Sequence, residues 1–309
     1  MRYGAVSAMV ILLVAASPAW GHHSEAGFDT EAAVAFQGTV TRFGWRNPHV
    51  YIDVEATDDA GKSVGWTVET GATPILMRSG WTRDSLSPGD AVTVRGHPER
   101  NTGRNYALLL TIDKADGTVL SQSDGDPQAV ASASDLSGTW RGCGPSIAAF
   151  RERLARVALT EKGAAAKAEY DFYSDSPSAM CIRPSTSWVV TSTLYVSAID
   201  FREDTVSIRS EFFDADRTVF MDGRAHPENG ERTNQGHSIG WWEDDVLVID
   251  TRLFADHRTG NGSGVPSGAQ KHVIEKFRLS EDRTRAIIDV FLEDPEYLAE
   301  PFMATLEWS

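Results

Sequence analysis

The C-terminal half of the chain alternates between apolar and polar residues with a period of two, and this feature constrains its fold most strongly. Val206, Ile208 and Phe212, for example, fall on one face of an expected strand, and the polar residues between them fall on the other. Such alternation is typical of strands that bury one face. Further strands are expected at residues 217–222, 236–243, 246–252, 271–279, 284–293 and 301–308. About eight or more antiparallel strands in meander order favour a closed barrel, because closure removes exposed edges.

The N-terminal part of the chain predicts a second, smaller barrel. Segments rich in Val, Thr, Ile and aromatic residues occupy residues 34–44, 49–57, 64–70, 91–96 and 106–113. Thr73 and Pro74 predict a short helix at residues 73–78, with Thr73 as its N-cap. Three strands, one helix and two more strands is the order of an OB-type barrel.

The expected architecture is therefore all-β with minor helices. It consists of a signal peptide at 1–21, an OB-like barrel at 22–120, a polar linker at 121–135 and a larger antiparallel up-and-down barrel at 136–309. The larger barrel opens with Gly-Thr-Trp, which resembles the first strand of lipocalins, so it is expected to be lipocalin-like. Helices are expected within residues 147–170, with one start at Thr160.

The first residues indicate export. Arg2 is followed by an apolar run at 6–16 and a small-x-small site at 19–21, which together are typical of a secretory signal peptide. The run is too short for a stable membrane anchor, so a periplasmic or secreted protein is expected. The formal net charge of −15 argues against nucleic acid and anionic membranes as partners. In an oxidising compartment Cys143 and Cys181 are most simply joined in a disulfide, and the alternative is a free reactive thiol.

A candidate acid–base pair is predicted in the larger barrel. A two-residue acidic turn would pair Trp241 with Val248 and Ile239 with Asp250. His237 and Asp250 are then diagonal neighbours on one face, within side-chain reach. A carboxylate that fixes the tautomer of an imidazole supports both general bases and metal ligands.

Glu275 extends this candidate site. It shares a strand face with apolar residues, so it is expected to point into the barrel, where a carboxylate needs a partner such as Arg224 or a histidine. The predicted catalytic set is His237, Asp250, Glu275 and Arg224, in which His237 moves a proton and Arg224 stabilises negative charge. The alternatives are a purely structural ion-pair network and a metal site.

The ligand of this site is expected to be a small, largely apolar molecule. Candidate ligand-binding residues are Asp222, His226, Trp241 and His272. Isomerisation, elimination and hydrolysis all fit, and the sequence carries no nucleotide-binding glycine fingerprint, serine-nucleophile elbow or haem-attachment motif. Whether catalysis occurs stays open at this stage. The Gly- and Ser-rich segment at 259–269 is either a plain connection or a flap over the barrel mouth.

A different class of function rests on the amino terminus. Cleavage after the small-x-small site would expose His22 and His23, and a terminal amine beside an imidazole chelates copper or another transition metal. His49 or His97 could complete such a site. The alternative function is therefore a non-catalytic periplasmic metal-binding or envelope protein.

Both halves resemble exported bacterial families of uncharacterised function. The N-terminal half carries the motifs HHS, GTV and W-x-NPH, and the C-terminal half carries MDGR-x-HP, GHSIG-x-WE and LVIDT. The resemblance implies export, a fusion of the two families and a β-rich fold. It implies no activity, so the chemistry has to come from the residues themselves.

Overall fold

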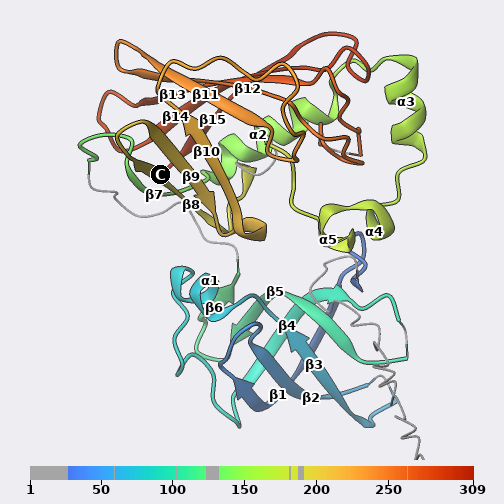
Figure 1. The fold of residues 1–309 in the computed structure, drawn as a ribbon. Coiled ribbons are helices and arrows are strands. Elements are labelled where there is room, and N and C mark those ends of the chain that lie inside the picture. The colour runs from blue at the N-terminus through green and yellow to red at the C-terminus, as the bar shows by residue number, and fades with distance from the viewer. Residues whose placement is uncertain are drawn as a thin grey trace, which may run out of the picture.

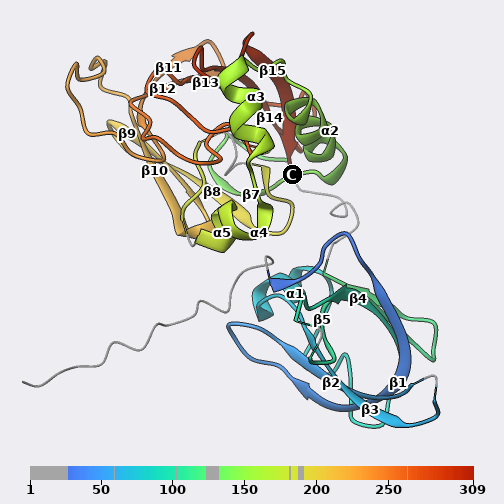
Figure 2. The ribbon, with the colours of Figure 1, turned by 90° about the vertical axis from the view of Figure 1, so that its right-hand side faces the viewer.

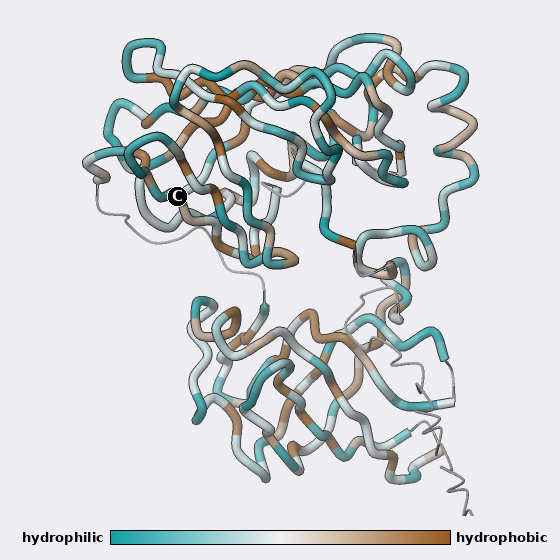
Figure 3. Tube along the Cα trace, in the orientation of Figure 1, coloured by the Kyte–Doolittle hydropathy of each residue, from teal (hydrophilic) through white to brown (hydrophobic). Residues whose placement is uncertain are grey.

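The computed structural model describes residues 27–58, 60–101, 103–122, 132–180, 182–186, 191–262 and 264–309. These residues form two β-barrels, one after the other along the sequence (Figure 1). Apolar residues gather along the strands, and hydrophilic residues are frequent in the connections (Figure 3). The predicted all-β class with minor helices is confirmed.

The first sheet closes into a small barrel. It contains β1 (Val34–Gly44), β2 (Tyr51–Thr57), β3 (Ser63–Glu69), β4 (Ala91–Pro98), β5 (Tyr106–Lys114) and β6 (Val119–Ser121). Strand β1 pairs with β2 and β4, and a parallel pairing of β3 with β5 closes five strands into a barrel (Figure 2). Helix α1 (Thr73–Arg78) lies between β3 and β4, so the predicted OB-like order is confirmed.

An apolar core fills this small barrel. Its fully buried side chains include Val40, Ile52, Val68, Leu76 and Trp81. Helix α1 contributes one of these and begins where predicted, but its N-cap is Ala72. The Thr73 hydroxyl instead donates to Asn47 Oδ1 at 2.8 Å, because the loop before β2 supplies the nearest acceptor.

The second sheet contains nine strands in sequence order. They are β7 (Gly138–Arg141), β8 (Val196–Phe201), β9 (Thr205–Ser210), β10 (Ala215–Phe220), β11 (His237–Glu243), β12 (Val246–Arg252), β13 (His272–Leu279), β14 (Ala286–Glu293) and β15 (Phe302–Trp308). The β11–β12 register is the predicted one, with Trp241 opposite Val248 and Ile239 opposite Asp250. Phe212 lies beyond the end of β9, so the predicted strand there is too long.

The second sheet is nearly closed, as predicted for a lipocalin-like barrel. Arg141 and Ser309, at the ends of β7 and β15, exchange backbone hydrogen bonds of 2.9 and 2.8 Å. The helices of this half are α2 (Gly144–Ala155), α3 (Glu161–Ala168), α4 (Phe172–Asp175) and α5 (Pro177–Met180). Helix α2 packs on β15, where the rings of Phe150 and Phe302 meet edge to face at 5.2 Å.

One neighbouring pair departs from the antiparallel prediction. Strands β10 and β11 run parallel and pair through two residues of each strand, Val219 and Phe220 with Ser238 and Ile239. The two strands are staggered, because the connection at 221–236 returns the chain beside the end of β10 before β11 begins. The rest of β10 lies before the start of β11, and the rest of β11 lies beyond the end of β10.

The two barrels contact each other near α1 and the segment before β8. Arg78 Nη2 lies 2.8 Å from a Glu211 carboxylate oxygen and 3.2 Å from the carbonyl oxygen of Leu194. The guanidinium carbon of Arg100 lies 3.5 Å from the ring centroid of Tyr173. Most of the predicted linker lies outside the described residues.

The Gly- and Ser-rich segment at 259–269 is packed into the second barrel. Asp294 Oδ2 accepts from Asn261 Nδ2 at 2.8 Å and from the Gly268 backbone N–H at 2.7 Å. Asn261 and Asp294 are both buried. The structure therefore favours a buried connection over an exposed flap.

Several predictions about export concern residues that the structure leaves undescribed. Residues 1–26 and Cys181 lie outside the described ranges, so the signal peptide and the disulfide stay predictions. Cys143 is buried, and Arg285 Nη1 lies 2.8 Å from its Sγ. Within the described ranges, no helix is both long enough and apolar enough to cross a membrane.

Candidate functional site

A continuous chain of imidazole and carboxylate contacts lies on the outer face of the second barrel. We call it the histidine chain, and it consists of His237, His226, Asp250, His272 and Glu293. His226 Nδ1 lies 2.9 Å from His237 Nδ1, and His226 Nε2 lies 3.0 Å from Asp250 Oδ1. On the other side, His272 Nε2 lies 3.0 Å from Asp250 Oδ2, and His272 Nδ1 lies 3.0 Å from Glu293 Oε1. Strands β11 to β14 each contribute one member, and His226 comes from the connection before β11.

These contacts restrict where the protons of the chain lie. Both nitrogens of His272 face carboxylate oxygens, which favours a proton on each nitrogen and a positively charged ring. His226 Nε2 faces Asp250, and its Nδ1 shares one proton with His237 Nδ1. In the tautomer in which His237 Nδ1 donates to His226, the Nε2 of His237 is unprotonated, which is the state that a general base requires.

The surroundings shift the two outer rings in opposite directions. The hydrogen bond to Asp250 raises the pKa of His272 above its ordinary value of 6.5. Burial, followed by the charges of His226 and Arg224, lowers the pKa of His237 below 6.5. Burial alone would raise the pKa of Asp250, but the hydrogen bond and charge of His272 outweigh it, so the net shift is downward.

We expect NMR titration of the imidazole rings to reproduce this order. His272 should titrate with a midpoint above 6.5 and His237 with a midpoint below it. His237→Gln and His272→Gln assign the two signals. Asp250→Asn removes the negative charge that holds His272 protonated, so it should lower the His272 midpoint. A His237 midpoint above that of His272 would contradict the proton assignment.

Glu275 points into the second barrel, as its strand phase predicts, and it is fully buried. Its partner is Arg217 of β10 instead of Arg224 or a histidine: Arg217 Nη1 lies 2.5 Å from Glu275 Oε2. The second atoms of the pair, Arg217 Nη2 and Glu275 Oε1, are buried without a hydrogen-bond partner among the described residues. This inner pair is separate from the histidine chain.

The expected single cluster of His237, Asp250 and Glu275 inside the barrel is therefore wrong. Ile249 lies opposite Glu275 in the β12–β13 register, and both side chains are buried in the interior. Asp250, the next residue along β12, consequently points to the outer face with His237. The predicted alternation holds on each strand, but Glu275 and Asp250 lie on opposite faces of the same sheet.

A pocket of about 460 Å³ adjoins His237 beside the short overlap of β10 and β11. Arg217 and His237 both line it, so the pocket connects the inner pair with the end of the histidine chain. Its wall also includes Arg183, Thr218, Phe220, Asn234 and Gln235. The Phe220 ring stacks on His237 with centroids 5.2 Å apart and planes 25° apart, which fixes the orientation of the imidazole.

Three other predicted site residues lie outside the lining of this pocket. Arg224 pairs with Asp222 at 2.5 Å, and its guanidinium carbon lies 4.0 Å from the Phe220 ring centroid. Arg224 therefore contacts the Phe220 ring but does not itself line the pocket. Trp241 is 40% exposed, and its Nε1 donates to Glu243 at 3.1 Å.

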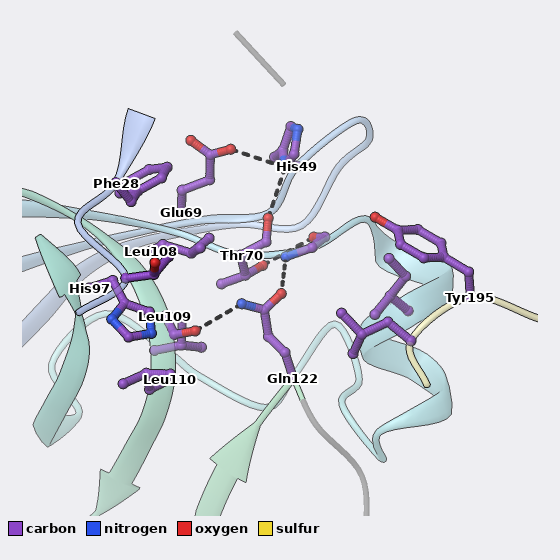
Figure 4. Close-up of a pocket in the computed structure, with 14 residues that line it drawn as sticks. Phe28, His49, Glu69, Thr70, His97, Leu108, Leu109, Leu110, Gln122 and Tyr195 are labelled. Atoms are coloured by element: carbon purple, nitrogen blue, oxygen red, sulfur yellow. Dashed lines mark hydrogen bonds and ion pairs between the residues drawn. The ribbon is translucent and has the colours of Figure 1, made fainter. Parts of the chain in front are cut away.

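A further pocket, of about 280 Å³, lies in the first barrel where residues of the second barrel border it (Figure 4). Glu69 forms its polar end and is 6% exposed. Glu69 Oε1 lies 3.2 Å from His49 Nδ1, and Oε2 accepts from the Tyr106 hydroxyl. His97 also lines this pocket, and its Nδ1 donates to the Ala32 carbonyl oxygen at 2.7 Å.

His49, Glu69 and His97 belong to a stretch that is similar to a known family. Residues 9–107 match a family of unknown function, DUF6152. The DUF6152 match covers less than half of the 309-residue chain and ends within β5. It supports the predicted uncharacterised N-terminal family, whereas the predicted second family and the fusion are not shown. No curated protein matches the chain.

The metal prediction stays untested. His22 and His23 lie outside the described residues. Among the residues that the structure does describe, no group of three or more His, Cys, Asp or Glu side chains is arranged to hold a metal ion. The prediction of copper or another transition metal therefore depends on the amino terminus.

Arg217 and Glu293 were not predicted as site residues from the sequence. Arg217 shares the inward phase of β10 with Ala215 and Val219, so the pattern that placed Glu275 inside also contained its partner. Glu293 lies on the outward phase of β14, where it reaches His272 from the neighbouring strand. In both cases the signal was present, but only the pairing of strands makes it specific.

Proposed function

We propose that this protein is exported and that its second barrel binds a small molecule beside His237 and moves a proton to or from it. The proposal rests on one observation: the chain from Asp250 through His226 ends on His237, which lines a pocket. An isomerase, a lyase and a hydrolase can all start from such a proton transfer. We also propose that the C-terminal half belongs to the exported family that its motifs resemble.

The histidine chain can take up a proton without charging His237 alone. A proton arriving at His237 Nε2 allows the Nδ1 proton to pass to His226 Nδ1, so the positive charge comes to lie beside Asp250. Burial lowers the pKa of His237, which keeps its ring neutral near neutral pH. Asp250 acts here as a positioning residue and not as the base.

The lining of the pocket is mostly apolar surface, with Arg183, Arg217 and His237 as its basic groups and Asp216 as its carboxylate. The side-chain amide nitrogens of Asn234 and Gln235 donate to backbone carbonyl oxygens, so the basic groups beside the Phe220 ring are the ones suited to a ligand. The buried Nη2 of Arg217 has no partner among the described residues, and a group that donates two hydrogen bonds is suited to a carboxylate. A small carboxylic acid or its ester would fit these groups.

We expect the wild-type protein to catalyse hydrogen–deuterium exchange at an acidic carbon of at least one small carbonyl compound in D₂O. A panel of 2-oxo acids, 3-hydroxy acids and esters is followed by the loss of C–H signals in proton NMR. His237→Gln should slow the exchange by about 10²–10⁴-fold, because it removes the base and leaves the pocket wall in place.

The matched control is Lys276→Gln, which changes an exposed ion pair with Glu243 on the outer face. It should exchange the same compounds at the wild-type rate. Thermal melts show whether His237→Gln keeps the fold. No exchange by the wild-type protein, or an unchanged rate in a folded His237→Gln variant, would overturn the proposal.

A further inference from the structure

The pocket of the first barrel has a distinct apolar wall. Leu108, Leu109 and Leu110 are consecutive in β5, and all three line it (Figure 4). They can do so because the register with β4 shifts between Arg95 and Gly96, which leaves Leu110 as an extra residue in β5. Leu110 is 39% exposed, which is unusual for a strand leucine and leaves apolar surface open to a ligand.

A buried carboxylate lies beside this wall, because Glu69 of β3 pairs with Leu108 in the β3–β5 register. Glu69 accepts from the Tyr106 hydroxyl and lies 3.2 Å from His49 Nδ1, but that nitrogen also lies 2.9 Å from the Thr70 carbonyl oxygen. Within the described chain, Glu69 forms no ion pair with a lysine or an arginine. A buried carboxylate normally has a cationic partner, because its desolvation is costly.

Arg104 interacts electrostatically with Glu69 but forms its ion pair with another carboxylate. Arg104 pairs with Glu99, and its guanidinium carbon lies 4.6 Å from the ring centroid of Tyr106. Burial, followed by the hydrogen bond and charge of Glu69, raises the pKa of Tyr106. The Tyr106 hydroxyl therefore stays a neutral donor, and the negative charge of Glu69 is not cancelled by it.

Two stacked aromatic rings, Phe28 and Tyr106, lie on the Glu69 side of the pocket, and Tyr195 lies on the other side (Figure 4). Phe28 lines the pocket and stacks on Tyr106, with centroids 5.7 Å apart and planes 18° apart. Tyr195 borders the pocket from the second barrel, together with Leu194. Aromatic faces beside a buried carboxylate are the surroundings that proteins use to bind organic ammonium groups.

We infer that this pocket binds a small amphipathic amine, with its ammonium group against Glu69 and its hydrocarbon part on the wall of Leu108–Leu110. The carboxylate of Glu69 and the leucine wall have complementary roles. The carboxylate selects for positive charge, and the leucines contribute apolar contact area. This site is separate from the pocket beside His237 and shares no residue with it.

The test compares three probes of equal chain length: hexylamine, hexanol and hexanoate. Binding is measured by calorimetry and by chemical-shift changes of the leucine methyl groups. Hexylamine should bind at least about tenfold more tightly than hexanol, and hexanoate should not bind measurably. In a series from ethylamine to hexylamine, affinity should rise by up to about fourfold for each CH₂ group that is buried.

Variants then separate the contribution of the carboxylate from that of the leucine wall. Glu69→Gln should reduce hexylamine affinity to that of hexanol, while retained hexanol binding shows that the pocket is still folded. Leu110→Ala should flatten the dependence on chain length. The matched control is Glu55→Gln, which changes an exposed glutamate of β2. Equal binding of all three probes, or unchanged selectivity in Glu69→Gln, would overturn the inference.

Discussion

Glu275→Ala should lower the free energy of unfolding of the second barrel by about 3–5 kcal/mol. Arg217 and Glu275 are 4% and 0% exposed at their side chains, so removing the carboxylate leaves a guanidinium charge in the barrel interior without compensation. Urea denaturation followed by tryptophan fluorescence measures the change. A loss below about 1 kcal/mol, the size expected for an exposed pair, would show that water or another group compensates Arg217.

A double variant distinguishes the ion pair from the space it fills. Arg217→Met with Glu275→Leu replaces both charges by apolar side chains of similar volume, so it should recover the loss and reach wild-type stability or exceed it. Lys276→Ala is the control, because it breaks an exposed pair with Glu243 at 3.1 Å. That control should stay within about 1 kcal/mol of the wild-type protein.

The second large effect concerns Lys271, whose amine is fully buried. Its Nζ lies 2.6 Å from the Gly260 carbonyl oxygen, 2.9 Å from Ser185 Oγ and 3.3 Å from the Thr186 carbonyl oxygen. The amine donates to these three neutral oxygens and forms no ion pair among the described residues, so burial disfavours its charged form. Burial lowers the pKa of Lys271 from 10.5 to about 7.

We therefore expect the free energy of unfolding to increase with pH above neutrality. Between pH 7 and 10.5 the unfolded chain holds the Lys271 proton and the folded protein increasingly does not, so the unfolded state binds more protons. The slope is at most about 1.4 kcal/mol per pH unit. Urea denaturation at about pH 7, 8 and 9 measures it, with Lys271→Met as the comparison. Parallel curves for the two proteins would contradict a neutral buried amine.

The strand pattern and one register could be predicted because local rules determine them. A two-residue turn fixes the pairing of Trp241 with Val248, and a period of two then fixes which residues share a face. The inward phase of Glu275 follows in the same way. These predictions needed no knowledge of distant contacts.

The composition of the site could not be predicted because it depends on tertiary pairing. Both faces of β12 carry apolar residues, Val248 on one and Ile249 on the other, so the alternation alone does not tell which face is inside. The pairing of Ile249 with Glu275 decides it. His226 lies in a connection without periodicity, and only its contact with Asp250 places it in the histidine chain.

The same limit applies to the first barrel. Glu69 is the last residue of β3, and its strand phase alone gives no reason to associate it with His49 or Tyr106. The parallel pairing of β3 with β5 brings Tyr106 beside it, and parallel neighbours distant in sequence have no local signal. The bulge that exposes Leu110 is likewise a property of the β4–β5 pair and not of either strand alone.

The short overlap of β10 and β11 lies beside the pocket that Arg217 and His237 line, at the side of the second barrel and not at its end. Barrels that bind ligands at an open end admit them past the loops of that end, so loop length controls access. Here the pocket lies beside two wall strands, and Arg217 of the interior lines it. Access of a ligand to this pocket would then depend on the pairing of β10 with β11. The backbone pairing of Val219 with Ser238 is the contact that would have to open for the pocket to widen.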